Sequence, residues 1–202
     1  MQRLRYEKIT RENIDVAMEI LQVIAYSSYG IAYYELDKYF NAQGTINLQP
    51  YLIYLEDLPI GTTGFYDYGE PDEVWLWFFG ILTEYRGRGL GKRILLDCIN
   101  MAKKIAGKQV LRLYTYSAWN SSAQPLYNKY MQLCERYRNS KENAFCIKHR
   151  EPIVYSVSLT ADAPRPWKSR FLDLTGEYKN HEIGKEMLAG NRELNQSLDF
   201  LC

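Results

Sequence analysis

The amino-acid sequence predicts a mixed α/β domain, and three observations support that fold class. Apolar runs at 51–55 and 61–68, joined by a proline-marked turn at 56–59, are typical of an antiparallel hairpin. An apolar, aromatic strand at 74–82 and an alternating strand at 110–116 enclose an amphipathic helix, which indicates a strand–helix–strand crossover. Hydrophobic residues make up 47% and charged residues 24% of the 202 residues, as in a soluble globular protein.

One strand and two helices are predicted before the hairpin. The strand spans residues 4–9. Thr10 then offers an N-cap for a helix through 13–21, and Asn13 stands where a capping box would have Glu. A second, shorter helix is predicted over 33–40. Strand, helices, hairpin and crossover together describe a mixed sheet with helices packed on it.

The predicted crossover contains a glycine inside its first strand. Gly80 interrupts an otherwise apolar run, and glycine in such a strand often marks a β-bulge. The helix that follows, over 92–104, carries four apolar residues at helical spacing: Leu95, Leu96, Ile99 and Ala102. Two closing strands are predicted at about 135–138 and 153–159.

Between this strand and this helix lies the glycine-rich turn Arg86–Gly91. Strand, glycine-rich turn and helix aim backbone N–H groups and a helix N-terminus at an anion, and Arg86, Arg88, Lys92 and Arg93 add positive charge. The turn is not a P-loop, because Arg93 stands where Ser or Thr is required. It is not a dinucleotide fingerprint either, because Lys92 occupies the last glycine position.

The spacing R-x-x-G-x-G, at Arg86, Gly89 and Gly91, does match a known pattern. It resembles the pyrophosphate-binding motif of the GNAT superfamily, the acyl-CoA-dependent N-acyltransferases. A second block is similar to the pattern that this family shows on a later helix. Its matching residues are Asn120, Ala123, Leu126 and Tyr127. The order of the predicted elements is also that of the GNAT fold, and the resemblance covers about residues 3 to 159.

The chain departs from the family at the end of that later helix. The family commonly has a Gly-Phe pair after Leu-Tyr, whereas this chain has Met131-Gln132. Since no glycine is available to cap the helix, we expect the helix to run on toward Leu133.

The resemblance implies a GNAT-like sheet that is splayed at its centre by a bulge, with acetyl-CoA as the acyl donor and no metal. The pantetheine arm would pair with the bulged strand, where the Phe79 N–H would polarise the thioester and Ile81 would bond the pantetheine. The turn would hold the pyrophosphate. The residues implied to bind the donor are Phe79, Ile81, Arg86, Gly87, Arg88, Gly89, Leu90, Gly91, Lys92 and Asn120.

The same resemblance implies direct attack by a primary amine in a ternary complex. Tyr127 would protonate the leaving thiolate, since a phenol with a pKa near 10 is protonated at neutral pH. Some family members have a Glu base on the bulged strand, but Trp75 occupies that position. Glu73, two residues earlier on the same strand face, could act through a water; a solvated strand-end charge is the alternative. Asn120 would order the loop or a water.

Carboxylates and aromatic residues gather in two places. The region where the family's first loop walls the acceptor site has Tyr29, Tyr33, Tyr34, Glu35, Asp37 and Tyr39. The tip of the hairpin has Asp67, Tyr68, Glu70, Asp72 and Glu73. This mixture suits a small cationic amine, such as a polyamine, an aminosugar antibiotic or a lysine-like amine. A packed helix and a solvated hairpin tip are the alternative. A protein or peptide N-acetyltransferase and a non-catalytic acyl-CoA-binding module are the competing functions, and Trp75 and Met131-Gln132 favour the last.

Composition predicts a cytoplasmic protein without nucleic-acid or membrane partners. The net charge of +1 provides no field for nucleic acid or anionic lipid, and no apolar run reaches the ~20 residues of a membrane span. The first residues lack the apolar core of a signal peptide. Four cysteines without C-x-x-C spacing and two histidines indicate no zinc site, and Cys98 is expected to be buried as a small hydrophobe.

Residues 160–202 are expected to form a C-terminal extension to an acetyltransferase domain at 1–159. The segment 161–166 is linker-like, and an apolar stripe of Leu188, Leu194, Leu198 and Leu201 is too small to fold alone. We expect the extension to pack on the domain or on a partner subunit, most simply in a homodimer. Disorder of the last dozen residues is the alternative.

Overall fold

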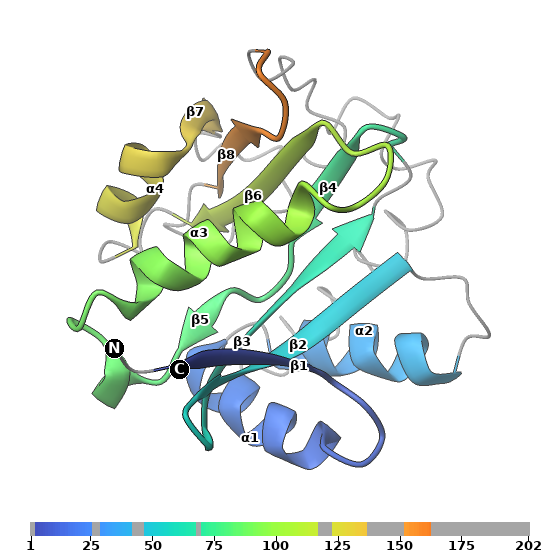
Figure 1. The fold of residues 1–202 in the computed structure, drawn as a ribbon. Helices are drawn as coiled ribbons and strands as arrows, with labels where there is room; N and C mark the ends of the chain where they lie inside the picture. Colours follow the sequence, from blue (N-terminus) through green and yellow to red (C-terminus); the bar gives the residue numbers. More distant parts are fainter. Residues whose placement is uncertain are drawn as a thin grey trace, which may run out of the picture. The chain divides into compact units, whose positions relative to one another are not determined.

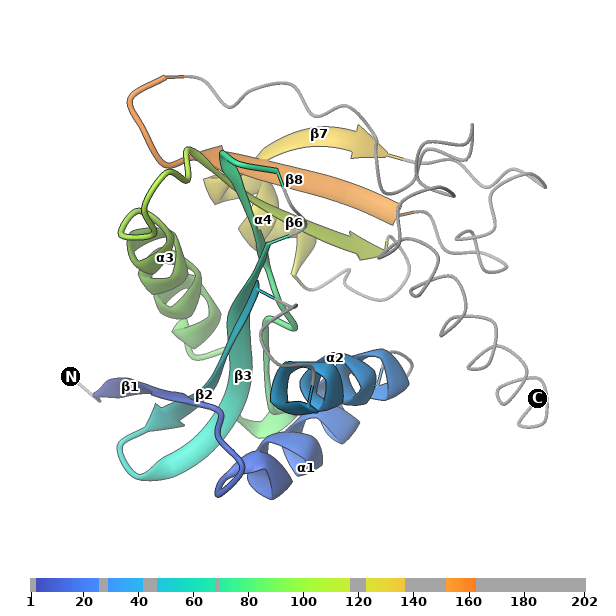
Figure 2. The ribbon, with the colours of Figure 1, turned by 90° about the vertical axis from the view of Figure 1, so that its right-hand side faces the viewer.

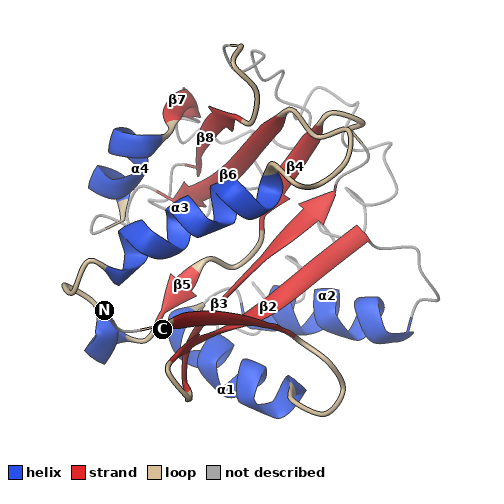
Figure 3. Cartoon of the chain, viewed as in Figure 1, coloured by secondary structure: helices blue, strands red, loops and turns tan. Residues whose placement is uncertain are grey.

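A computed structural model of the 202-residue chain (Figure 1) describes residues 3–25, 29–41, 47–67, 70–116, 123–136 and 152–162. The chain divides into two compact units, Met1–Leu111 and Arg112–Cys202. Each unit is built from strands with helices beside them (Figure 3), so the predicted mixed α/β class is confirmed.

The first unit contains an antiparallel sheet with strand order β1-β2-β3-β4. These strands are β1 (Leu4–Lys8), β2 (Asn47–Leu55), β3 (Leu58–Asp67) and β4 (Glu73–Leu76). A short strand, β5 (Gly80–Ile81), also pairs with β3. Because β3 pairs with β2 on one side and with both β4 and β5 on the other, it is the central strand of this unit.

Three helices cover the two faces of this sheet. They are α1 (Ile14–Ile24), α2 (Tyr29–Asn41) and α3 (Leu90–Ala102). Figure 2 shows α3 on one side of β3, with α1 and α2 on the other. Apolar side chains at helical spacing, such as Leu21 of α1 and Leu95 of α3, are fully buried and form a core on each face. β3 therefore lies between two apolar layers.

Cys98 of α3 lies in the core, as expected. Its Sγ is 3.3 Å from Oγ1 of Thr63 on β3, and burial raises the pKa of the Cys98 thiol to about 12. The thiol is thus kept protonated and behaves as a small apolar group with a weak hydrogen bond.

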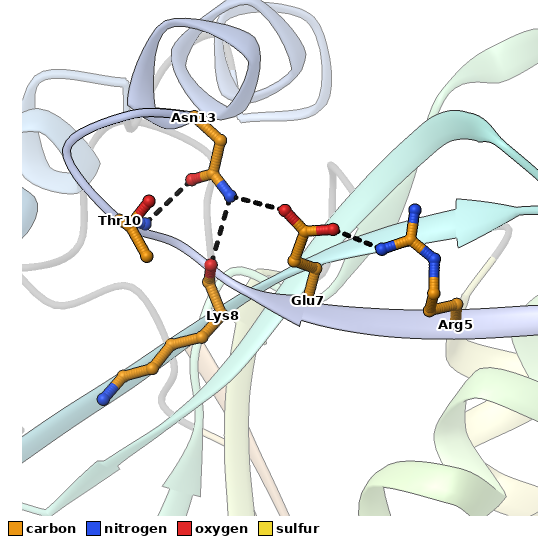
Figure 4. Close-up of polar contacts among 5 residues, drawn as sticks. All are labelled: Arg5, Glu7, Lys8, Thr10 and Asn13. Carbon is orange, nitrogen blue, oxygen red and sulfur yellow. Dashed lines mark hydrogen bonds and ion pairs between the residues drawn. The ribbon is translucent and has the colours of Figure 1, made fainter.

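The start of α1 differs from the prediction (Figure 4). The N-cap is Asn13 and not Thr10, because residues 11–13 form a turn before the helix. Asn13 Oδ1 accepts a hydrogen bond from the Thr10 N–H at 2.8 Å, and Nδ2 donates to Glu7 Oε1 at 3.0 Å and to the Lys8 carbonyl at 3.1 Å. Glu7 also pairs with Arg5, and both contacts lower the pKa of the Glu7 carboxyl. The Asn13 amide therefore ties the helix start to β1.

The hairpin turn is shorter than the predicted 56–59. Only Glu56 and Asp57 separate β2 from β3, and Glu56 adopts a left-handed φ of 55°. Pro59 lies in β3 opposite Tyr54, beside an irregularity in the register. A proline near the start of a strand and next to a bulge removes no required ladder bond, which is why it does not end the strand.

The second unit contains α4 (Gln124–Tyr130), β7 (Gln132–Arg136), β8 (Pro152–Ser158) and, from Arg112 on, β6 (Val110–Tyr116). β8 lies between β6 and β7 and is antiparallel to β7. The expected run of the helix toward Leu133 is wrong: α4 ends at Tyr130, Met131 is extended, and Leu133 pairs with Tyr155 of β8. Strand pairing with β8 stops the helix without a glycine.

Residues 163–202 lie outside the described residues, so the predicted docking of the extension and the boundary at 159/160 stay predictions. None of the helices in the described ranges is long and apolar enough to cross a membrane.

Candidate functional site

The strand predicted over 74–82 is interrupted in the structure. β4 ends at Leu76, opposite Phe65 of β3, and β5 begins at Gly80, opposite Thr62. Between these two pairs β3 has two residues, whereas the opposite segment has three, Trp77–Phe79. One extra residue on one side of a strand pair is a β-bulge. The bulge predicted from Gly80 is confirmed, and it lies immediately before the glycine.

β3 holds the bulge at two points. The Trp77 N–H donates to the Gly64 carbonyl at 2.9 Å, and the Thr62 hydroxyl donates to the Phe78 carbonyl at 2.9 Å. Phe78 has a φ of 32°, a positive value that L side chains rarely adopt and that costs roughly 1–3 kcal/mol. Such a conformation persists only where its surroundings fix it.

Two glycines allow close packing around the bulge. A Cβ on Gly80 would lie 3.0 Å from Ile24 Cδ1, so the glycine lets α1 approach β5. A Cβ on Gly64 would lie 3.2 Å from Cε3 of Trp77 and 2.7 Å from the Gln49 carbonyl. Gly80 is thus needed for the contact with α1. The residue of the bulge that has a positive φ is Phe78.

A buried carboxyl reaches the bulge from α2. Glu35 is 5% exposed, and its Oε2 accepts a hydrogen bond from Trp77 Nε1 at 2.5 Å. Burial raises the pKa of Glu35 to about 7, against the opposing effect of the indole N–H. Glu35 is one of the residues predicted near the acceptor site, and its burial was not predicted. The signal was its spacing, since Ala32 and Leu36 on the same helix are fully buried.

The glycine-rich turn forms the start of α3. Gly87 and Gly89 have φ values of 76° and 75°, and a Cβ on either would meet no atom within 4 Å. Gly89 is the N-cap, and the first intrahelical bond runs from the Arg93 N–H to its carbonyl at 3.3 Å. The N–H groups of Leu90 and Gly91 therefore lie at the helix end, where no intrahelical acceptor exists. Open space, backbone donors and a helix N-terminus suit a pyrophosphate.

The charged side chains of the turn are exposed and differ in role. Arg86 Nε donates to the Ile81 carbonyl at 3.1 Å, which ties the turn to β5. The Arg88 guanidinium lies 5.6 Å from the ring centre of Tyr85. Lys92 is exposed, whereas Leu90 is buried in the core and can offer an anion only its backbone. The predicted binding residues of this unit thus follow one another along the bulge, β5 and the turn.

Glu73 is the first residue of β4 and is 2% exposed, so a solvated strand-end charge is excluded. Trp75, equally buried, pairs with Tyr66 of β3. Since alternate residues share a strand face, Glu73 and Trp75 lie on the same side of the sheet as Trp77, which is the side covered by α2.

The acidic residues after the hairpin are not a solvated cluster. Lys108 Nζ forms an ion pair with Asp67 Oδ2 at 2.6 Å and donates to the Glu70 carbonyl at 2.9 Å. The side chains of Lys108 and Asp67 are only 9% and 21% exposed. Asp67 is therefore neutralised within the protein, and Tyr68 lies outside the described residues.

Tyr127, the predicted proton donor, belongs to the second unit. It is 4% exposed on α4, and its ring centre lies 5.4 Å from that of Tyr155 on β8. The Tyr155 hydroxyl donates to Asn128 Oδ1 at 3.0 Å, which anchors the same helix. Asn120 lies outside the described residues. In the part of the chain that the structure describes, no group of three His, Cys, Asp or Glu side chains could hold a metal ion.

Solved structures share this fold. A GNAT family acetyltransferase from Elizabethkingia anophelis, with acetyl-CoA bound, is 15% identical, with a TM-score of 0.60 over 77% of this chain and 97% of that chain. The ribosomal-protein-S18-alanine N-acetyltransferase from Escherichia coli is 14% identical, with a TM-score of 0.59 over 82% and 100%. A spermidine/spermine N-acetyltransferase from Vibrio cholerae is 12% identical, with a TM-score of 0.59 over 78% and 93%.

No curated protein matches the chain in sequence. The model of the acetyltransferase (GNAT) family, however, matches residues 14–131, a span that includes the bulge, the glycine-rich turn and Tyr127. The turn motif, the bulge, the fold and this match agree, and the chain belongs to the GNAT acetyltransferase family.

Proposed function

We propose that the protein is an acetyl-CoA-dependent N-acetyltransferase that acts on a primary amine of a small cationic molecule. The observation that carries the proposal is the R-x-x-G-x-G turn, which opens α3 and follows the bulged strand after a short 3₁₀ helix, Thr83–Tyr85. Membership of the family supports the donor, and a structural neighbour has acetyl-CoA bound. The backbone of residues 87–92 would hold the pyrophosphate, and the bulge would receive the thioester.

In this proposal the amine attacks the thioester carbonyl carbon directly, forming a C–N bond while the C–S bond breaks. The Phe79 N–H stabilises the charge that develops on the carbonyl oxygen, a contribution of ~3 kcal/mol for one aligned donor in a dry site. The electron pair of the broken bond leaves on sulfur, and Tyr127 supplies the proton. The proton lost by the amine passes through water to a base, for which the buried Glu73 is our candidate.

Two features bear on the acceptor. A structural neighbour is a spermidine/spermine N-acetyltransferase, and the buried Glu73 lies on the side of the sheet that α2 covers. Both support a cationic amine. The similarity to the ribosomal-protein-S18-alanine N-acetyltransferase supports a protein N-terminus as the second candidate. Asp67 supports neither kind of acceptor, because its charge is neutralised by the ion pair with Lys108.

Thiol release from acetyl-CoA tests the proposal. The protein is offered small amines (spermidine, kanamycin and lysine methyl ester), a pool of peptides, or no acceptor, and the products are weighed by mass spectrometry. We expect thiol release with the small amines and a product heavier by one acetyl group. Release with peptides alone would identify a protein acetyltransferase. Binding of acetyl-CoA without release in any pool would identify a non-catalytic module.

A further inference from the structure

We propose that Glu35 is a positioning residue, which holds the Trp77 indole and through it fixes the Trp77–Phe79 bulge. The inference deepens the proposed function and rests on it, because the bulge matters for transfer only if the Phe79 N–H acts on the thioester. It assigns to α2 a role in setting the geometry of the reaction.

The packing of α2 does not explain a carboxyl at position 35. Ala32 and Leu36 are fully buried on the same helix, so an apolar side chain at this position would continue the core. Burying a carboxyl instead is costly unless it is hydrogen-bonded. The compensating contact is the 2.5 Å hydrogen bond from Trp77 Nε1. The hydrogen bond with Trp77 therefore explains why a carboxyl is buried at position 35.

Trp77 is placed where its side chain can affect the backbone conformation of the bulge. It is the first of the three bulge residues, and its backbone N–H is fixed to the Gly64 carbonyl at 2.9 Å. Its ring lies over Gly64, where a Cβ would come within 3.2 Å, and makes an edge contact with Phe78 at 5.0 Å between ring centres. Glu35 thus holds the indole of a residue whose backbone β3 already holds.

The bulge contains a backbone conformation that needs such support. Phe78 has a φ of 32°, and its carbonyl is fixed by the Thr62 hydroxyl at 2.9 Å. Relaxing this residue toward an ordinary strand would turn the peptide that carries the Phe79 N–H. Contacts from β3 hold the backbone, and Glu35 holds the side chain that precedes the strained residue. Losing the Glu35 contact should therefore misalign the donor without unfolding the unit.

The test compares Glu35→Ala, Glu35→Gln and Trp77→Phe, with Arg11→Ala as a matched control. Arg11 also secures α2, through hydrogen bonds to the Phe40 carbonyl and Asn41 Oδ1, but it makes them at the far end of the helix. The readouts are kcat and the KM for acetyl-CoA with spermidine, or the best acceptor of the screen, and the ¹H–¹⁵N resonances of the Trp77 indole and the Phe79 amide.

We expect kcat to fall about tenfold in Glu35→Ala and in Trp77→Phe, with the KM for acetyl-CoA changed less than about twofold. Glu35→Gln should keep most of the activity, since an amide oxygen still accepts the indole N–H. Arg11→Ala should match the wild type. The Phe79 amide resonance should move in Glu35→Ala and Trp77→Phe alone. If Glu35→Ala fails to fold, Trp77→Phe still tests the proposal, because it removes the donor of the same hydrogen bond.

Wild-type kcat and an unmoved Phe79 resonance in folded Glu35→Ala and Trp77→Phe would overturn the inference. So would an equal loss in Glu35→Gln and Glu35→Ala, because the charge and not the hydrogen bond would then matter. Failure of the proposed function is visible separately, as a wild-type protein that transfers acetyl to no acceptor. In that case the Phe79 resonance decides alone whether Glu35 fixes the bulge.

Discussion

The Trp77 indole N–H donates to the Glu35 carboxyl across the boundary between the bulged strand and α2, and both side chains are at most 5% exposed. A titratable group is thereby placed in the core of the first unit. Burial raises the pKa of Glu35 and the Trp77 N–H lowers it, and no charged side chain of the described residues adds to these two effects.

Glu35 should make the stability of the protein depend on pH. Its pKa is about 7 in the folded protein against an ordinary value of 4.5, so between these values the folded state binds more protons than the unfolded state. The free energy of unfolding should therefore fall as the pH rises from 4.5 to 7, by on the order of 3 kcal/mol, and stay level above. Urea titrations of the wild type and Glu35→Gln from pH 4 to pH 8 should diverge by this amount. Parallel curves would show that the carboxyl is not buried as described.

Asn13→Ala should lower the free energy of unfolding by about 1–2 kcal/mol. The substitution removes the hydrogen bonds to the Thr10 N–H, to Glu7 and to the Lys8 carbonyl (Figure 4). Asn100→Ala, at an exposed position within α3, is the control and should cost nothing. Equal stabilities of the two variants would contradict the role given to Asn13.

Tyr127→Phe should lower kcat by about 10²-fold and leave the affinity for acetyl-CoA unchanged, because the hydroxyl acts on a thiolate that exists only as the bond breaks. Rapid-quench kinetics and calorimetry separate the two effects. Tyr155→Phe, which removes the neighbouring hydroxyl that holds Asn128, is the control and should keep kcat. Parallel losses of kcat and affinity in Tyr127→Phe would make Tyr127 a packing residue.

Much of the fold could be predicted because its signals are local. The apolar spacing of α3, the alternation of β6 and the glycines of the turn each depend on a few neighbouring residues. Gly87 and Gly89 do adopt the positive φ values that their type suggested. The end of α4 could not be predicted in this way. It depends on the pairing of Leu133 with Tyr155, a partner 22 residues away in the sequence.

The candidate site was predictable in its motif and less so in its supporting contacts. Gly80 pointed to the bulge, yet the strained residue is Phe78, whose positive φ nothing in its own chemistry suggests. The burial of Glu35 and the pairing of Asp67 with Lys108 likewise depend on tertiary neighbours. The sequence alone predicts both acids as candidates for acceptor binding. Their partners are 42 and 41 residues away, beyond what any local pattern reports.

Calorimetric titration of acetyl-CoA into Gly89→Asp and Gly89→Asn tests the anion site. A Cβ at Gly89 would meet no atom within 4 Å, and Asp and Asn both tolerate its left-handed φ of 75°. The pair therefore differs mainly in charge at the proposed pyrophosphate site. We predict saturable one-to-one binding to the wild type, weaker but measurable binding to Gly89→Asn, and none to Gly89→Asp, with unchanged circular dichroism. A wild-type protein that does not bind acetyl-CoA, or a Gly89→Asp variant that binds it as tightly as Gly89→Asn, would contradict the assignment of this turn to the acyl donor.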